Sequence, residues 1–318
     1  MLSRVADALY WMGRYLERAE HCTRLLLVTE DFSTEILALH EELARAEWAD
    51  LLAIFPGSRL TRRAFPKAAP FAFPYLTSFY LDDQNPYSTF FSLRKARENA
   101  RAVREALTLE VFLGLNDAYH ALEAQARRGI RDVPAFRDAL SATQKGLLGT
   151  VGAIAHTLTR DQGWLFLKLG EAIERTARTA TILIAKLPAL LDPAPKTDIP
   201  LYYTRWRSLL RGLASLENYR KARGAQMEPA LVLRFVLFDA DAPRALNYGC
   251  RAVKDCLDRL DKPGELTAPA RIVGRLCSRL SYEDREVMRR GDYLGFLHSV
   301  LAGLDQAHEA IAAQYFVT

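Results

Sequence analysis

The stretch "LYWMGRYLERAE" (residues 9–20) decides the fold, because its periodicity is helical and continues over residues 2 to 31. At about 100° per residue, apolar side chains fall on one broad side of this run and charged ones on the other. Gly13 lies at the edge of the polar side, although a glycine inside a helix costs up to about 1 kcal/mol relative to alanine. The glycine therefore predicts that another helix or a ligand closely approaches the backbone there.

A second stretch repeats this pattern in the other half of the chain. With a shift of 157 positions, "GRYLERAEHCTRLL" (13–26) aligns with "GEAIERTARTATIL" (170–183), so that the glycine, an apolar residue and Glu-Arg coincide. The match predicts an internal duplication, with pseudo-equivalent halves at 1–160 and 161–318 inside a single helical domain covering 1–318. Two unrelated amphipathic helices can also match over so few positions, and that alternative stays open.

The rest of the chain has helical patterns as well. No segment alternates convincingly as a strand, and there is no glycine-rich phosphate-binding loop. We therefore predict an all-α fold, a large helical bundle whose two halves are pseudo-symmetric if the duplication holds. Asp241, shortly before Pro243, is expected to cap one of the helices. Further helices are expected at 34–53, 88–128, 134–158, 165–187, 201–222, 228–238, 242–261 and 267–316, the last with a break near Gly291.

Residues 55–88 interrupt the helical pattern with five prolines and several aromatic residues. Proline breaks helices and central strands, so this insertion is expected to be a long ordered loop or a set of helical turns. Exposed aromatic side chains are costly unless something covers them. We therefore favour a partner-docking surface or a lid, the alternative being a loop packed over the end of the bundle.

Composition limits the class of protein. The chain has 318 residues, 50% hydrophobic and 25% charged, enough for one long domain or two of ordinary size. The net charge of +5 is too weak and too interleaved with acidic residues for a nucleic-acid-binding footprint. No stretch is apolar enough to span a membrane, and the N-terminus does not resemble a signal peptide. The four cysteines lack disulfide or zinc spacing, so we expect a cytoplasmic protein with free thiols.

Several segments resemble one known family. The opening "MLSRVADALYWMGRYLERAEHCTRLL" (1–26) closely resembles the start of the bacterial alpha-E domain family. Three further segments are similar to it, namely "ENARAVREALTLEVFLGLN" (98–116), "DQGWLFLKLGEAIERTARTATIL" (161–183) and "LRFVLFDADAPRALNYGC" (233–250). Ala8 departs from an expected asparagine and Ala245 from an expected serine. The first position is therefore given no role.

The resemblance implies an all-helical protein encoded beside, or fused to, circularly permuted ATP-grasp proteins, often with a transglutaminase-like protease. ATP-grasp enzymes activate a carboxylate as an acyl phosphate and join it to an amine. The implied function is therefore a helical partner subunit of an amide or peptide ligase, an amidoligase of peptide biosynthesis or modification. ATP and Mg would bind the partner and no cofactor would bind this chain. Whether this chain is itself catalytic stays open.

The two Glu-Arg helices and the arginine-rich helix from Ser88 supply a candidate site. Inward-facing arginines would bind the carboxylate of an amino acid or peptide, and a glutamate could accept a proton from an amine. Glu17 and Glu174 are the catalytic candidates. The substrate-binding candidates are Arg14, Arg18, Asn99, Arg101, Arg104, Glu105, Arg175 and Arg244.

A purely structural role is the alternative for these residues. The charged side of the first helix could be a solvated surface, and Arg–Glu pairs between helices could simply fix register. Asn99 is expected to find a structural hydrogen-bond partner, and Arg244 to pair with a carboxylate.

Two alternative functions remain from the sequence. Asp117–His120 and Asp305–His308, an acid three residues before a histidine, could build a carboxylate metal site together with Glu17 and Glu174. That chain would be a stand-alone metal-dependent bundle enzyme. The other alternative is a purely structural scaffold.

Overall fold

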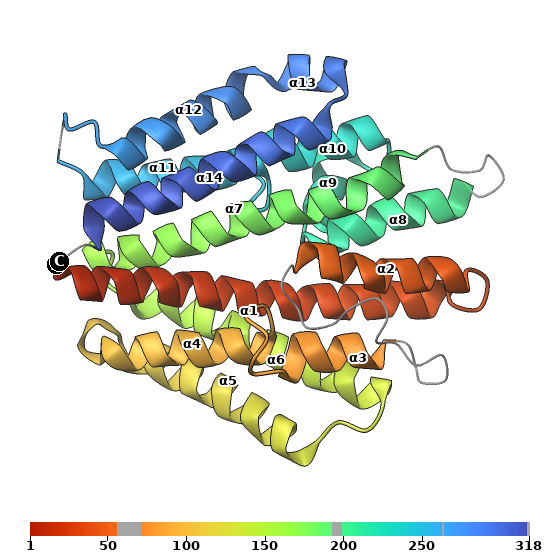
Figure 1. The fold of residues 1–318 in the computed structure, drawn as a ribbon, viewed down its shortest axis with the longest axis horizontal. Coiled ribbons are helices and arrows are strands. Elements are labelled where there is room, and N and C mark those ends of the chain that lie inside the picture. Colours follow the sequence, from red (N-terminus) through yellow and green to blue (C-terminus); the bar gives the residue numbers. More distant parts are fainter. Residues whose placement is uncertain (56–71, 193–198, 263, 317–318) are drawn as a thin grey trace. The chain divides into compact units, whose positions relative to one another are not determined.

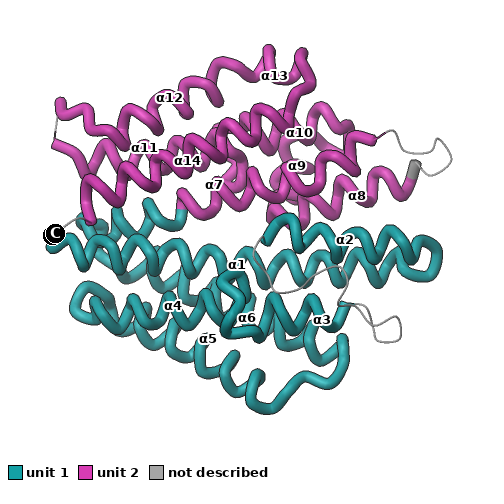
Figure 2. Tube along the Cα trace, in the orientation of Figure 1, with its two compact units in different colours: residues 1–171 teal, residues 172–318 magenta. Residues whose placement is uncertain are grey.

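All regular elements in the described part of the chain are helices, so the all-α prediction is confirmed (Figure 1). The computed structural model describes residues 1–55, 72–192, 199–262 and 264–316. None of the described helices is long and apolar enough to cross a lipid bilayer. The chain divides into two compact units, Met1–Glu171 and Ala172–Thr318 (Figure 2).

Unit 1 is built around its first helix. Its helices are α1 (Ser3–Ile36), α2 (Glu41–Ile54), α3 (Phe73–Leu76) continuing as a π-helix (Thr77–Leu81), α4 (Thr89–Ala102), a 3-10 turn (Arg104–Ala106), α5 (Leu109–Arg128), α6 (Val133–Thr157) and the first turns of α7 (Gln162–Leu191). Helix α1 packs against α2, α4 and α6, and α5 packs against α4 and α6. Met12, Leu16 and Leu26 are fully or almost fully buried, as the periodicity predicts.

The polar side of α1 is also buried, which the periodicity did not predict. Glu17, Arg18, Glu20, His21 and Arg24 are all buried. The solvated-surface interpretation of this charged side is therefore wrong, because other elements cover α1 on its polar side too. Charged groups removed from water need partners of their own, so α1 must carry a buried polar network.

Unit 2 contains the rest of α7 and seven further helices. These are α8 (Ile199–Gly212), α9 (Leu216–Arg223), α10 (Pro229–Phe238), α11 (Leu246–Leu260), α12 (Ala268–Tyr282), α13 (Asp284–Arg290) and α14 (Tyr293–Tyr315). Helix α12 packs against α11, α13 and α14, and α10 packs against α11. Trp206, Tyr219 and Leu257 belong to its fully buried core.

Four predicted helices differ from the structure. The helix expected at 201–222 is divided into α8 and α9, and the one expected at 267–316 is interrupted after Tyr282 as well as near Gly291. The helix expected at 88–128 is interrupted after α4, where Val103 leaves helical geometry with φ of −129°. The helix expected from 242 begins only at Leu246, because the side chain of Asp239 accepts hydrogen bonds from the backbone N–H groups of Asp241 and Ala242. This turn competes with helical geometry, so Asp241 is not the cap.

The described part of the proline- and aromatic-rich insertion packs into unit 1. Phe79 and Tyr80 are fully buried, and the Tyr80 hydroxyl donates to Gln125 Oε1 at 2.5 Å and lies 2.8 Å from Thr143 Oγ1. These aromatic groups serve the core, which favours the packed-loop interpretation from Ala72 onward. Residues 56–71, where the rest of the docking-surface prediction falls, lie outside the described residues.

The shift of 157 positions also relates elements beyond the two Glu-Arg helices. Added to Thr89, the first residue of α4, it gives Leu246, the first residue of α11. It also relates α2 to α8, the segment from α3 through the π-helix to α10, α5 to α12, and α6 to α14, with ends that differ by a few residues. The helix pairs α4–α5 and α5–α6 of unit 1 have counterparts in α11–α12 and α12–α14 of unit 2.

The turns before α4 and α11 agree in detail. Asp82 Oδ1 accepts from the N–H of Gln84 at 2.9 Å, and Asp239 Oδ1 accepts from the N–H of Asp241 at 2.9 Å. The duplication and its boundary at 160/161 stay predictions, which this agreement favours. The compact units divide instead within α7, whose first turns pack in unit 1.

Candidate functional site

The two glycines of the repeated pattern make one reciprocal backbone contact inside unit 1. A Cβ atom on Gly13 would lie 2.1 Å from the carbonyl oxygen of Leu167, and one on Gly170 would lie 2.0 Å from that of Tyr10. Each glycine thus faces the carbonyl three residues before the other glycine. Of the two explanations for Gly13, a helix or a ligand, the structure shows the helix.

One helical turn beyond each glycine stands a buried glutamate. Glu17 on α1 is 4% exposed, and Glu174 on α7 is 0% exposed. Glu174 Oε1 lies 3.3 Å from Nε of Arg178, four residues later on the same helix. Burying an unpaired carboxylate is very costly, so a partner such as Arg178 stabilises Glu174 in the core. The predicted catalytic role of both glutamates stays a prediction.

A second buried polar group on α1 was missed by the sequence reasoning. Glu20 Oε1 accepts from Arg24 on the next turn and from Gln144 Nε2 of α6 at 2.7 Å. Arg24 also reaches His21, with 3.2 Å between Nη2 and Nδ1. The i,i+4 spacing of Glu20 and Arg24 predicts that they form an ion pair on one helix, but it does not predict that the pair is buried.

Arg14 and Arg18 lie on an aromatic surface of unit 1, as part of a group that we call the arginine–aromatic cluster. The guanidinium carbon of Arg14 is 4.7 Å from the ring centre of Trp11. That of Arg18 is 5.2 Å from Tyr15 and 5.6 Å from Tyr87. Such cation–π contacts hold a guanidinium in a fixed orientation and contribute about 0.5–2 kcal/mol each.

Helix α4 extends the arginine–aromatic cluster. The ring of Phe91 lies 6.3 Å from that of Tyr15, and the guanidinium of Arg94 lies 5.4 Å over Phe91. Arg94 also donates to the backbone oxygen of Asp83 at 3.0 Å. The structure therefore brings Arg14, Arg18 and Arg94 into one cluster of stacked cations, each half-buried or buried. Such a surface suits a carboxylate with a flat or apolar attachment.

The remaining arginine-helix candidates do not join this cluster. Arg101 and Glu105 are exposed. Arg104 stacks over Phe112 at 4.5 Å and donates to the backbone oxygen of Leu107 at 3.1 Å. Because α4 ends at Ala102, Arg104 does not lie on the arginine-rich helix that the sequence predicts from Ser88. Asn99 Nδ2 donates to the backbone oxygen of Lys95 at 3.0 Å, the structural partner expected for it.

Arg97 instead organises a surface cluster between α4 and α5. Its Nε donates to Asn116 Oδ1 at 2.6 Å, its Nη2 lies 3.4 Å from His120 Nε2, and its guanidinium stacks over Tyr119 at 4.7 Å. His120 Nδ1 lies 3.4 Å from Glu123, and this hydrogen bond is the main cause that lowers the pKa of the Glu123 carboxyl. Both ring nitrogens of His120 therefore face protein groups.

This arrangement does not favour the metal-site alternative. In the part of the chain that the structure describes, no three His, Cys, Asp or Glu side chains are grouped as metal ligands would be. Asp117–His120 and Asp305–His308 lie on α5 and α14, in different units.

The unit 2 candidates surround a second close helix contact. A Cβ atom on Gly249 of α11 would lie 2.1 Å from Oγ1 of Thr176 on α7. Thr179, one turn along α7, donates to the backbone oxygen of Arg244 at 3.2 Å. Arg175 and Arg244 are both half-buried. The backbone of Arg244 thus helps to fix the turn before α11 against α7.

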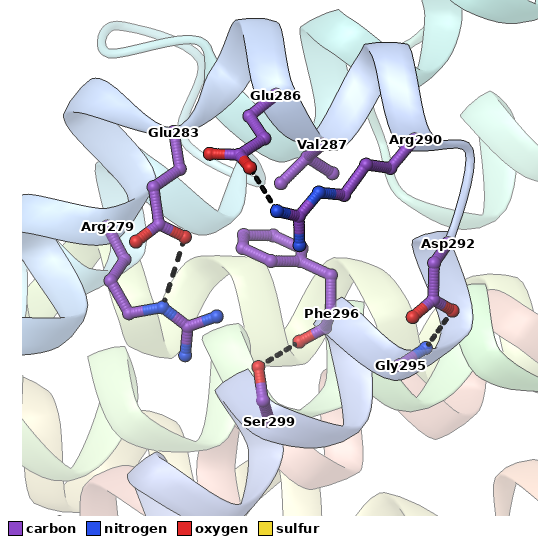
Figure 3. A pocket seen from close by; sticks show the side chains of 9 residues that line it. All are labelled: Arg279, Glu283, Glu286, Val287, Arg290, Asp292, Gly295, Phe296 and Ser299. Carbon is purple, nitrogen blue, oxygen red and sulfur yellow. Dashed lines mark hydrogen bonds and ion pairs between the residues drawn. The ribbon is translucent and has the colours of Figure 1, made fainter.

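A pocket of about 360 Å³ lies between α12, α13 and α14 (Figure 3). Its charges pair with each other, since Arg279 Nε lies 3.2 Å from Glu283 and Arg290 pairs with Glu286. The carboxylate of Asp292 accepts from the N–H of Gly295 at 2.9 Å. With its ionic groups so paired, this pocket is a weaker ligand candidate than the arginine–aromatic cluster.

Comparison with known proteins places this geometry in context. Uncharacterized proteins of Mycobacterium bovis and of Mycobacterium tuberculosis strain CDC 1551 are each 28% identical to the chain over 327 residues. A third, from Mycobacterium tuberculosis strain H37Rv, is 27% identical. The match covers 97% of the chain but only 36% of each relative, so the chain spans about a third of their length. No solved structure matches it.

A family model identifies the helical domain itself. The family is described as a predicted alpha-helical domain with a conserved ER motif, and its model matches residues 1–316. Glu-Arg occurs twice in the sequence, at 17–18 and 174–175, one turn after each of the two contacting glycines. The chain therefore belongs to the alpha-E family.

Proposed function

We propose that this alpha-E protein is the helical partner subunit of an ATP-grasp-type amide or peptide ligase, in which it binds or presents an amino-acid or peptide substrate. The proposal places ATP and Mg on the ligase, and a transglutaminase-like protease is a second candidate partner. One observation carries the partnership. Nearly all of this chain matches its relatives, yet most of each relative lies outside the match, so there the alpha-E region is covalently joined to further protein.

The arginine–aromatic cluster is the substrate-binding part of the proposal. In ligation through an acyl phosphate, an amine attacks the activated carbonyl carbon and phosphate leaves from that carbon. The attacking nitrogen also loses a proton, which a base accepts. A stacked guanidinium such as Arg18 would hold a substrate carboxylate bidentately, away from the reacting end. Glu17, adjacent in sequence to Arg18, would accept the proton if its side chain becomes accessible in the complex.

Affinity capture tests the partnership. The tagged full-length chain is purified from its native organism, and co-purifying proteins are quantified by mass spectrometry. An ATP-grasp protein in near-stoichiometric amount is expected. A homogeneous particle of this chain alone would overturn the proposal, and metal analysis of that particle would then test the independent-enzyme alternative.

Conservative variants test the substrate site within the captured complex. Arg18→Lys keeps the charge but loses the planar fork, so the KM for the carboxylate substrate is expected to rise with little change in kcat. Glu17→Gln is expected to lower kcat. If Glu17→Gln and Glu174→Gln both leave the activity of the complex unchanged, the glutamates have no role as bases.

The structural-scaffold function is the second candidate, and a specific observation favours it. Glu17 and Glu174 are almost inaccessible, and Glu174 is already paired with Arg178. A scaffold predicts that charge reversal at Glu174 disrupts folding, whereas Glu174→Gln leaves ligase activity intact. Thermal unfolding and activity of the same two variants distinguish this function from substrate binding.

A further inference from the structure

A second candidate surface lies on unit 2, away from the Glu-Arg pairs in the sequence. It is a groove of about 630 Å³ between α11 and α12. Lys254 lines it from α11, and Arg271 and Arg275 line it from α12. Between the two arginines, Gly274 forms part of the lining, with Leu266 just before α12. The groove therefore combines cationic and apolar groups along one helix.

The positive charge of this groove is only partly neutralised within the described residues, where Arg279, a further lining residue, pairs with Glu283. Lys254 pairs with Asp258, the one acidic residue of the lining. Arg271 and Arg275 are exposed and one turn apart, and neither has an ion pair with a carboxylate anywhere in the described ranges. Two guanidinium groups at this spacing match two carboxylates one turn apart on another helix.

The groove also has room for apolar side chains. Leu266 is 69% exposed at its edge. A Cβ atom built on Gly274 would meet nothing within 4 Å. An incoming leucine or phenylalanine could thus lie over Gly274 and cover Leu266, which would remove apolar surface from water.

The corresponding surface of unit 1 is covered by a helix of the chain itself. Subtracting 157 from Arg271 and Arg275 gives Gly114 and Ala118 of α5. There α6 packs directly, since a Cβ atom on Gly114 would lie 3.4 Å from Thr150 Oγ1 and one on Gly146 would lie 3.5 Å from the Cβ of Ala118. Small residues in unit 1 therefore admit a helix where unit 2 has arginines.

Helix α14, which the shift relates to α6, meets α12 at Leu276 rather than at Arg275, the position related to Ala118. A Cβ atom on Gly303 of α14 would lie 2.7 Å from a methyl group of Leu276. Arg271 and Arg275 are consequently left at the surface, although the matching side of α5 is a helix-packing surface. This face therefore presents exposed cations at positions where the related face of unit 1 packs against a helix.

We infer that the groove between α11 and α12 binds an acidic amphipathic helix of a partner protein. Two of its carboxylates, one turn apart, pair with Arg271 and Arg275, and its apolar residues contact Leu266 and the space over Gly274. The electrostatic part accelerates association and sets the choice of partner, while the apolar part slows dissociation. This inference does not depend on the proposed ligase function.

Fluorescence anisotropy on the full-length chain tests it. The probe is a fluorescein-labelled amphipathic helical peptide with glutamates at i,i+4 and leucines on the adjacent face, compared with its lysine analogue. The glutamate peptide is expected to bind and the lysine peptide not to. Arg271→Glu with Arg275→Glu is expected to weaken binding at least about tenfold, which corresponds to about 1.4 kcal/mol.

The chain offers a matched control for this charge reversal. Arg285 and Arg289 are also exposed, one turn apart on α13, and line neither groove. Arg285→Glu with Arg289→Glu changes the net charge equally and is expected to leave the affinity within about twofold, because salt screens the charges of exposed residues that do not line the groove. Gly274→Phe fills the groove without changing charge and is expected to abolish binding.

Four outcomes would overturn the inference. Equal loss of affinity in the control pair would mean that only net charge matters. Unchanged affinity in Gly274→Phe would remove the apolar part of the site. Complete displacement of the peptide by inorganic phosphate, added at the same concentration of negative charge, would show that the groove is a simple anion site. Analytical ultracentrifugation could show that the wild-type chain self-associates and that the variant Arg271→Glu with Arg275→Glu is monomeric. That result would mean that the face binds another copy of the chain.

Discussion

Gly13→Ala tests the reciprocal helix contact most directly. The new methyl carbon would lie 2.1 Å from the carbonyl oxygen of Leu167, where ordinary contact begins at 3.4 Å, so the two backbones must separate by about 1.3 Å. The obstacle is backbone, which cannot rotate away as a side chain can. Overpacking costs about 1–3 kcal/mol, and we expect its upper range here. Alanine returns up to about 1 kcal/mol of helix propensity, which leaves a net loss of about 2 kcal/mol.

Differential scanning calorimetry measures this loss. For domains of 150–250 residues, about 2 kcal/mol corresponds to a fall in Tm of about 4–8 °C. Gly149→Ala, on α6, is the control, because a Cβ atom there meets nothing within 4 Å and the variant should unfold at or above the wild-type temperature. Gly13→Ala combined with Gly170→Ala should cost less than the sum of the two, since one separation relieves both clashes. A Gly13→Ala protein as stable as the wild type would refute this account.

Three further measurements address other features. Ser88→Ala removes the side-chain acceptor for the N–H of Phe91 at the start of α4 and should lower the free energy of unfolding by about 1 kcal/mol. Ala245→Ser should add a cap to α11 and raise the free energy of unfolding. Urea titration of both variants measures these changes. Burial raises the pKa of the Tyr80 hydroxyl above its ordinary value, so the folded state holds this proton more tightly and stability should fall as the pH rises above about 10. In Tyr80→Phe the Tm should fall less between pH 9 and pH 11. The variant should also lose about 1–3 kcal/mol of unfolding free energy, because the hydrogen-bond partners of the hydroxyl are left unpaired. Burial also raises the pKa of the Cys277 thiol to about 11, so its alkylation by iodoacetamide at pH 8 should be much slower in the native than in the urea-unfolded protein, as peptide mass spectrometry can follow.

The helical class and most helices were predictable, because period and helix breakers are local properties of the sequence. The break at Val103 was not, since no proline or glycine marks it and the apolar pattern continues through it. The turn at Asp239 was missed for a related reason. Two acidic residues in this segment could each end or begin a helix, and only the hydrogen bonds decide between them.

The candidate site was partly predictable. The closeness of a neighbour to Gly13 followed from the energetic cost of a helical glycine, but the identity of that neighbour is a tertiary property. The aromatic faces that hold Arg14 and Arg18 include Tyr87, far from both in sequence, so no local pattern could have located it. Burial on the polar side of α1 was hidden for the same reason, because charge runs in sequence usually mark solvent-exposed faces.

The contact between Gly13 and Gly170 bears on how such a chain can change over time. A half-length chain that paired with a copy of itself would form both sides of this contact from one glycine. In the present chain the same contact depends on two separate codons, and a change in either one alone pushes both backbones apart. Fusion of two such halves would thus allow all remaining positions to diverge independently in each half. It would also double the number of glycine positions at which a substitution disrupts the helix contact.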